Sequence, residues 1–196
     1  MELAEGEVLF REGEEADRLW LLLSGQIKMM RTGGRGCETI LEVIMPGELL
    51  GGAVILQEDN PSTAVAMAPS RLLGIPRVEW CDAIRRNPEL ALGLIGLLGG
   101  RLRLVMAAHA ATTERVDRRI AAILVRLADK TGRDGPGGRR LGIALTRQDL
   151  ADMAGTTVET AIRVMSRFRK EGIAENDPGG FIVIRDQDAL EDLCPE

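Results

Sequence analysis

Residues 145–168 constrain the fold of this 196-residue chain more than any other stretch. Thr146 precedes a short amphipathic run, Gly155 interrupts the pattern, and a second amphipathic run follows. A threonine directly before an apolar run is a preferred helix N-cap. Thr156 and Glu159 match the Thr-x-x-Glu capping box that opens a helix. Two short helices joined by a turn that contains glycine predict a helix-turn-helix.

The second of these helices carries side chains suited to reading DNA bases. Glu159 and Arg163 are four residues apart, so they share a face near the helix N-terminus. In helix-turn-helix proteins that end enters the major groove, where an arginine can donate two hydrogen bonds to guanine and a glutamate can accept one from cytosine. A Glu–Arg pair at this spacing also occurs on many ordinary helices, so the pair alone does not decide between the two interpretations.

The residues that follow favour the DNA-binding interpretation. Residues 172–175 and 180–184 flank an Asp-Pro-Gly turn, which predicts a β-hairpin wing. Basic residues outnumber acidic ones over 111–176, although the whole chain has a net charge of −5. We therefore predict contacts with double-stranded DNA, both to bases and to phosphates near the start of the first helix. The predicted DNA-binding residues are Thr146, Arg147, Gln148, Thr157, Val158, Glu159, Thr160 and Arg163.

Frequent glycines divide the N-terminal part into short apolar runs, over 19–23, 40–44 and 63–67. Short runs with regular turn signals predict an antiparallel β-roll or sandwich. The chain as a whole is therefore predicted to be α+β. Its predicted parts are a β-roll sensor domain over 1–86, a long helix over 87–116 and a winged helix-turn-helix domain over 117–196.

The long helix is predicted to form a dimer interface. Asn87 is a suitable N-cap, and Pro88 suits the first helical position. From there, residues recur in alternating steps of three and four, as in a coiled coil that meets its own copy. Packing of this helix against its own β-roll is the alternative. We call the following residues the dimer seam: Ile95, Leu98, Leu102, Val105, His109, Thr112 and Val116. A second helix is predicted over 115–130, followed by a loop over 131–142.

Several other classes of protein are disfavoured. The cysteines Cys37, Cys81 and Cys194 are far apart, with neither a disulfide pattern nor the spacing of metal ligands. The first seven residues are acidic and lack the parts of a secretory signal, and every long apolar run is broken by polar residues. We therefore expect a cytoplasmic protein with no membrane partner. No catalytic set or phosphate-binding loop is found, so we expect a non-enzyme.

The chain resembles the CRP/FNR superfamily of bacterial transcription regulators along nearly its whole length. The resemblance is carried by residues 145–163 and 169–173, and in the sensor by residues 6–13, 16–20, 24–25 and 46–48. It implies a β-roll of the cyclic-nucleotide-binding jelly-roll type, a dimerisation helix and a winged helix-turn-helix. It also implies a homodimer on a palindromic operator, with RNA polymerase as a further partner.

Individual positions refine what the resemblance implies. Glu159 and Arg163 match the base-reading residues of the family, whereas Val158 replaces the arginine of cyclic-AMP receptors. Val158-Glu159-Thr160 is similar to the FNR branch, whose half-sites are of the TTGAT kind. Ile162 replaces the serine common there, so the outer base of the half-site stays open.

The effector pocket departs from the cyclic-AMP-binding pattern. Family members that bind cyclic AMP have a phosphate cassette with Gly-Glu-Leu and Arg-Ser, but this chain has Gly51-Gly52-Ala53 and Pro61-Ser62. An anionic cyclic phosphate would find no cation there, so we predict that cyclic AMP does not bind. Three scattered cysteines also cannot hold an FNR-type iron–sulfur cluster. The predicted effector pocket comprises Gly51, Gly52, Ala53, Pro61, Ser62, Leu102, Val105, Met106 and His109.

His109, the only histidine, has three interpretations: a packed interface residue, a haem ligand or a pH-sensitive contact across the dimer. The effector is therefore unknown, with haem and nitric-oxide sensing as one alternative. Two other functional alternatives stay open: a dimer that binds DNA without any effector, and a cyclic-nucleotide-type module that acts on a protein partner.

Overall fold

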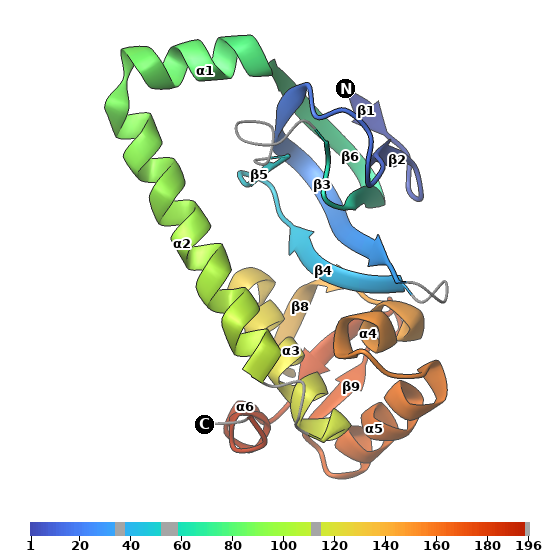
Figure 1. Cartoon of the computed structure of the whole chain (residues 1–196). Helices are drawn as coiled ribbons and strands as arrows, with labels where there is room; N and C mark the ends of the chain where they lie inside the picture. The colour runs from blue at the N-terminus through green and yellow to red at the C-terminus, as the bar shows by residue number, and fades with distance from the viewer. Residues whose placement is uncertain (34–37, 52–58, 111–114, 195–196) are drawn as a thin grey trace. The chain divides into compact units, whose positions relative to one another are not determined.

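The computed structural model describes residues 1–33, 38–51, 59–110 and 115–194, with residues 104–110 described as backbone only. The chain forms two compact units, Met1–Arg103 and Leu104–Glu196 (Figure 1). No helix within the described ranges has the length and apolar character that crossing a membrane requires.

The first unit is built on a six-stranded antiparallel sheet. Its strands are β1 (Glu2–Leu3), β2 (Val8–Phe10), β3 (Arg18–Thr32), β4 (Glu38–Ile44), β5 (Leu49–Leu50) and β6 (Thr63–Pro76). The order is β1-β6-β3-β4, while β2 also pairs with β6 and β5 with β3. The predicted β-roll is confirmed, but two of the expected short strands are parts of the long strands β3 and β6. Register shifts near Gly25, whose φ is 89°, let these long strands bend around the core.

The core of this unit lies between the strands. Its central members are the buried side chains of Leu22, Ile27, Ile44, Leu50 and Leu72. They come from four strands, β3, β4, β5 and β6, and each is exposed by 2% or less. Burial of this kind contributes about 1.5–3 kcal/mol for each large aliphatic side chain.

Two helices follow the sheet, α1 (Arg77–Arg86) and α2 (Pro88–Ala110). The sequence reasoning missed α1, which has no capping side chain and buries no residue fully. Helix α2 starts at Pro88, as expected. The prediction of one helix through residue 116 is wrong at its end, because Arg115 is extended and Val116 is the first residue of the next helix. Val116 fits the three-and-four spacing of the dimer seam, but it belongs to the next helix. Residue spacing alone does not indicate where one helix ends and another begins.

The second unit packs its helices against two β-hairpins. Helix α3 (Val116–Thr131) precedes β7 (Arg133–Gly135) and β8 (Gly138–Ala144). Then come α4 (Arg147–Ala154), α5 (Val158–Lys170), β9 (Ala174–Asn176), β10 (Phe181–Ile184) and the short α6 (Gln187–Glu191). The four strands form an antiparallel sheet in the order β7-β8-β10-β9. The predicted helix over 115–130 and the predicted wing are confirmed.

The predicted loop over 131–142 is wrong, because most of it forms the β7–β8 hairpin. Arg133 pairs with Arg140, which in turn pairs with Val183 of β10. The segment is rich in glycine and arginine and lacks an alternating apolar pattern. Pairing with the distant strand β10 therefore decides its structure, and that pairing is not visible locally.

Candidate nucleic-acid interface

Helix α4 begins with a complete capping box. The Oγ1 of Thr146 accepts a hydrogen bond from the backbone N–H of Asp149 at 3.0 Å, and the Asp149 carboxylate accepts one from the N–H of Thr146 at 3.1 Å. The helix ends at Gly155, which has φ 57° and ψ 49°, the left-handed conformation that glycine adopts at low cost. The predicted cap at Thr146 and the predicted turn at Gly155 are both confirmed.

Helix α5 begins one residue later than predicted. Thr157 is its N-cap, and the Thr157 Oγ1 accepts a hydrogen bond from the N–H of Thr160 at 3.3 Å. The expected capping box of Thr156 and Glu159 is therefore wrong. Both residues can match the motif, but the sharp turn after Gly155 places the extended backbone conformation of an N-cap at Thr157. Glu159 then stands in the first turn with its carboxylate free of a capping role.

One face of α5 is buried and apolar, and the other is exposed and carries charged side chains. Ala161, Val164, Met165 and Phe168 are buried against the unit, while Glu159, Ile162 and Arg163 are exposed. The Nη2 of Arg163 donates a hydrogen bond to the Oγ1 of Thr160 at 3.1 Å. Glu159 and Arg163 form no ion pair in the part of the chain that the structure describes. Both charged groups are thus available on one solvent-facing surface near the N-terminus of the helix.

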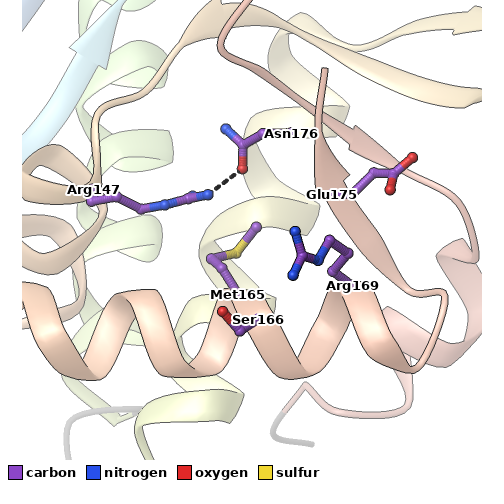
Figure 2. A pocket seen from close by; sticks show the side chains of 6 residues that line it. All are labelled: Arg147, Met165, Ser166, Arg169, Glu175 and Asn176. Carbon is purple, nitrogen blue, oxygen red and sulfur yellow. Dashed lines mark hydrogen bonds between the residues drawn. The ribbon is translucent and has the colours of Figure 1, made fainter. Parts of the chain in front are cut away.

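The predicted phosphate contacts at the start of α4 have different surroundings. Thr146 and Gln148 are exposed, and the Nε2 of Gln148 donates to the Asp152 carboxylate at 2.7 Å. Arg147 instead turns into a cavity, where its Nη2 donates to the Oδ1 of Asn176 at 2.5 Å (Figure 2). Burial, together with the nearby charge of Arg169, lowers the pKa of the Arg147 guanidinium. The residue nevertheless remains a cation at neutral pH.

Helix α3 holds the helix-turn-helix in place. Arg119 donates to the carbonyl oxygens of Ala154 and Gly155, at 2.9 and 3.4 Å, and so fixes the turn between α4 and α5. The sequence reasoning missed this residue, because its partners lie 35 and 36 positions along the chain.

A second contact joins α3 to α5, the second helix of the helix-turn-helix. The Nη2 of Arg167 donates to the Asp117 carboxylate at 2.8 Å. Burial acts to raise the pKa of Asp117, but hydrogen bonds from Arg167 and the N–H of Arg118, with the charges of Arg167 and Arg115, hold that pKa below its usual value. This ion pair was also missed, since its partners are 50 residues apart.

The wing is closed by one carboxylate. Asp177 accepts hydrogen bonds from the N–H groups of Gly179 and Phe181, at 2.8 and 3.0 Å. It also accepts from the Nε of Arg140 at 2.7 Å, and the Arg140 guanidinium lies 3.6 Å from the centre of the Phe181 ring. These contacts order the turn between β9 and β10.

The residues of the predicted dimer seam that lie in the first unit are exposed. Ile95, Leu98 and Leu102 are exposed by 64, 41 and 60%. Beside this stripe, α2 contacts its own sheet, since the Nη2 of Arg101 donates to the carbonyl oxygen of Leu49 at 2.6 Å. The alternative of packing against the β-roll is therefore observed, and it leaves these three seam side chains exposed. The seam residue Thr112 lies outside the described residues, as do the side chains of Val105 and His109.

The predicted effector residues are described only in part. Gly51 follows β5 with φ 78°, Pro61 is exposed and Ser62 is buried. Gly52, Ala53 and the side chain of Met106 lie outside the described residues. The composition of an effector pocket from these residues therefore stays a prediction.

Comparison with known proteins agrees with this architecture. Residues 1–87 match the family model of the cyclic nucleotide-binding domain, and residues 118–193 match that of the Crp-like helix-turn-helix domain. The chain is 31% identical to the cyclic AMP receptor protein of Thermus thermophilus, over 97% of this chain and 85% of that protein. It is 28% identical to the fumarate and nitrate reduction regulatory protein of Escherichia coli, over 98% of this chain and 77% of that protein.

Solved structures show the same fold. FixK2 from Bradyrhizobium japonicum superposes with a TM-score of 0.90 at 20% identity, over 100% of this chain and 96% of that one. A CooA mutant from Carboxydothermus hydrogenoformans superposes with a TM-score of 0.82 at 21% identity, over 98% of this chain and 85% of that one.

Proposed function

The chain belongs to the CRP/FNR superfamily of DNA-binding transcription regulators, and we propose that it binds a palindromic operator as a homodimer with α5 in the major groove. The observation that carries this proposal is the exposed pair Glu159 and Arg163 on the first turns of α5, opposite a fully apolar buried face. This arrangement presents a donor and an acceptor for base edges on a rigid helix.

The chemistry of base reading follows from these side chains. The Arg163 guanidinium can donate two hydrogen bonds to the O6 and N7 of a guanine, and the Glu159 carboxylate can accept one from the N4 of a cytosine. Val158 offers an apolar contact that suits a thymine methyl group. We propose that the hydroxyls of Thr146, Thr157 and Thr160 contact phosphates. We therefore propose half-sites of the TTGAT kind.

The dimer is supported by the exposed part of the seam. Three large aliphatic side chains on one stripe of α2 are costly to leave in water, and a two-fold partner would cover them with an identical stripe. Two copies of α5 related by such an axis would contact successive major grooves of a palindromic site. RNA polymerase is the further partner that we propose for such a regulator.

The effector that we propose is not cyclic AMP. In the resemblance to cyclic-AMP-binding members, Gly52 stands where their cassette has glutamate and Pro61 stands where it has arginine. An anion brought there would lose its hydration without gaining a cation. Haem remains an alternative effector with His109 as its candidate ligand, and control would act by different affinities for two arrangements of the dimer.

Selection from a pool of random duplexes tests the proposed DNA recognition. The purified full-length protein should enrich an inverted repeat with TTGAT-like halves. Enrichment of a single unrepeated motif would contradict the dimeric arrangement, and enrichment of nothing above the starting pool would contradict sequence-specific binding. The selected duplex then serves for the effector experiments.

Titration of the effector candidates uses this duplex at constant salt. Cyclic AMP at millimolar concentration should leave the DNA affinity unchanged, whereas a tenfold or greater rise would refute our reading of the cassette. Haem is tested in parallel by the visible absorption spectrum and by DNA affinity. Equal affinity with every candidate would favour the dimer that binds DNA without an effector.

A further inference from the structure

A small cavity lies inside the DNA-binding unit, beside the recognition helix. It has a volume of about 90 Å³ and lies between the first residue of α4, the second half of α5 and β9 (Figure 2). Its lining residues are Arg147, Met165, Ser166, Arg169, Glu175 and Asn176. Figure 2 shows the guanidinium groups of Arg147 and Arg169 directed toward the same space.

The cavity has an uncompensated positive charge. The Nη1 of Arg147 is buried and has no hydrogen-bond partner, although its Nη2 donates to Asn176. The exposed side chain of Arg169 makes no hydrogen bond or ion pair with any residue that the structure describes. The buried Nη1 of Arg147 therefore costs folding free energy unless a hydrogen-bond acceptor binds there.

The one carboxylate of the lining does not neutralise this charge. Glu175 is engaged by Arg185, whose Nη2 and Nε donate to its Oε1 at 2.6 and 3.0 Å. In Figure 2 the Glu175 carboxylate points away from the two guanidiniums. Two like charges close together in a partly buried site repel each other. The pKa of Arg147 is accordingly lowered, mainly by burial and then by the charge of Arg169.

We propose that Arg147 and Arg169 form an anion-binding cradle, with Ser166 as a hydroxyl donor, that holds one phosphate of the DNA backbone. Guanidinium forks match phosphate oxygens in geometry as well as charge. Ser166 lies seven residues after Glu159 and three after Arg163, so it continues the same stripe of α5. The cradle thus adjoins the base-reading face, and this inference rests on the proposed DNA-binding function.

The test compares two exposed cations that are neighbours on α5. Arg169→Gln removes a cradle residue, while Lys170→Gln removes the same charge from a side chain that does not line the cavity. Both positions are exposed, so both full-length variants should fold, which circular dichroism and thermal unfolding check. Affinity for a random-sequence duplex is measured from about 50 to 200 mM salt, a range in which phosphate contacts dominate binding.

We expect Arg169→Gln to lower the slope of log affinity against log salt by about one per DNA-bound protomer, and to weaken binding several-fold. Lys170→Gln should change the slope clearly less. The losses in Arg147→Gln and Arg169→Gln should be less than additive in the double variant, because both side chains hold one phosphate. An unchanged slope in Arg169→Gln, or equal losses in Arg169→Gln and Lys170→Gln, would overturn the cradle.

A separate arm distinguishes backbone phosphate from free phosphate. Inorganic phosphate is titrated into the protein without DNA, with chloride at matched ionic strength as the control. Submillimolar phosphate binding that Arg169→Gln abolishes, combined with an unchanged salt slope for DNA, would assign the cradle to a free anion and overturn DNA as its occupant. If the wild-type protein binds no duplex at all, the proposed function fails as well, and this outcome is distinct from failure of the cradle alone.

Discussion

Among single residues, Arg163 is the side chain on which sequence recognition depends most. Arg163→Ala should cost about 1–3 kcal/mol of binding to the selected operator, because a bidentate contact with guanine is lost. Binding to random DNA should change far less. The measurement is the ratio of operator affinity to random-duplex affinity, with Arg133→Ala as the control, since Arg133 is an exposed cation on β7. A preserved ratio in Arg163→Ala would show that this side chain does not read bases.

The ion pair of Asp117 and Arg167 predicts a dependence of stability on pH. The pKa of Asp117 is lowered in the folded protein, so its stabilising contribution is present above the unfolded pKa, near about 3.9, and is lost as the pH falls through the lower folded pKa. Asp117→Asn should therefore reduce the unfolding free energy at pH 7 by about 1 kcal/mol, since Arg167 is partly solvent-screened.

The difference between wild type and Asp117→Asn should shrink as the pH is lowered toward 3. Thermal unfolding of the full-length proteins at several pH values measures it. Arg167→Gln should remove most of the same pH-dependent difference, because it deletes the partner. A stability difference between wild type and Asp117→Asn that is equal at pH 7 and pH 3 would show that another interaction accounts for the destabilisation.

The chemical types of the site residues were predictable, but their environments were not. Glu159 and Arg163 were found from their spacing on one helix, and both are exposed as expected. Arg147 was predicted from its place at a helix start, but it turns into the cavity toward Asn176, which lies 29 residues away. Asp117 and Arg119 gave no signal, because their partners in the helix-turn-helix lie 50, 35 and 36 positions further along the chain.

At the scale of an element, the N-cap of α5 offers a sharp comparison between two adjacent threonines. Thr157 makes the capping hydrogen bond, whereas Thr156 does not. Thr157→Ala should lower the unfolding free energy by about 1 kcal/mol, because the N–H of Thr160 loses its acceptor. Thr156→Ala should cost much less. Denaturant unfolding measures both, and a larger loss in Thr156→Ala would restore the capping box that the sequence pattern indicated.

Elements with local signals were predicted well, and elements without them were not. Helices α3 and α5 have strong amphipathic patterns, and α4 and α5 have side-chain caps. The strands β7 and β8 were taken for a loop because their glycines and Asp134 have low strand preference. Pairing with β10 overrides that preference. Helix α1 was missed because it neither caps its start with a side chain nor buries a face.

At the scale of the whole molecule, the dimer seam predicts how the oligomeric state responds to charge. Leu102→Glu places a carboxylate on a side chain that is 60% exposed in the single chain, so it should fold normally but weaken self-association. Val78→Glu is the control, because Val78 is 72% exposed on α1 and lies outside the seam. Light scattering at several concentrations should show Leu102→Glu as monomer where wild type is dimer. A dimer that withstands Leu102→Glu would place the interface elsewhere.

The sequence by itself determined the two types of unit, the helix-turn-helix with its glycine turn, and the exposed face of α5 that carries Glu159 and Arg163. These features depend on periodicity, capping and backbone conformation, which act over about four residues. They can therefore be recognised in a short stretch of sequence. Only the tertiary structure decided that residues 133–144 pair into a sheet, that Thr157 rather than Thr156 caps α5, and that Arg147 meets Arg169 beside β9. The sheet and the place of Arg147 depend on contacts between residues far apart in the chain, and the cap depends on the turn at Gly155, which Arg119 of α3 holds. No local pattern encodes the free energy of such contacts.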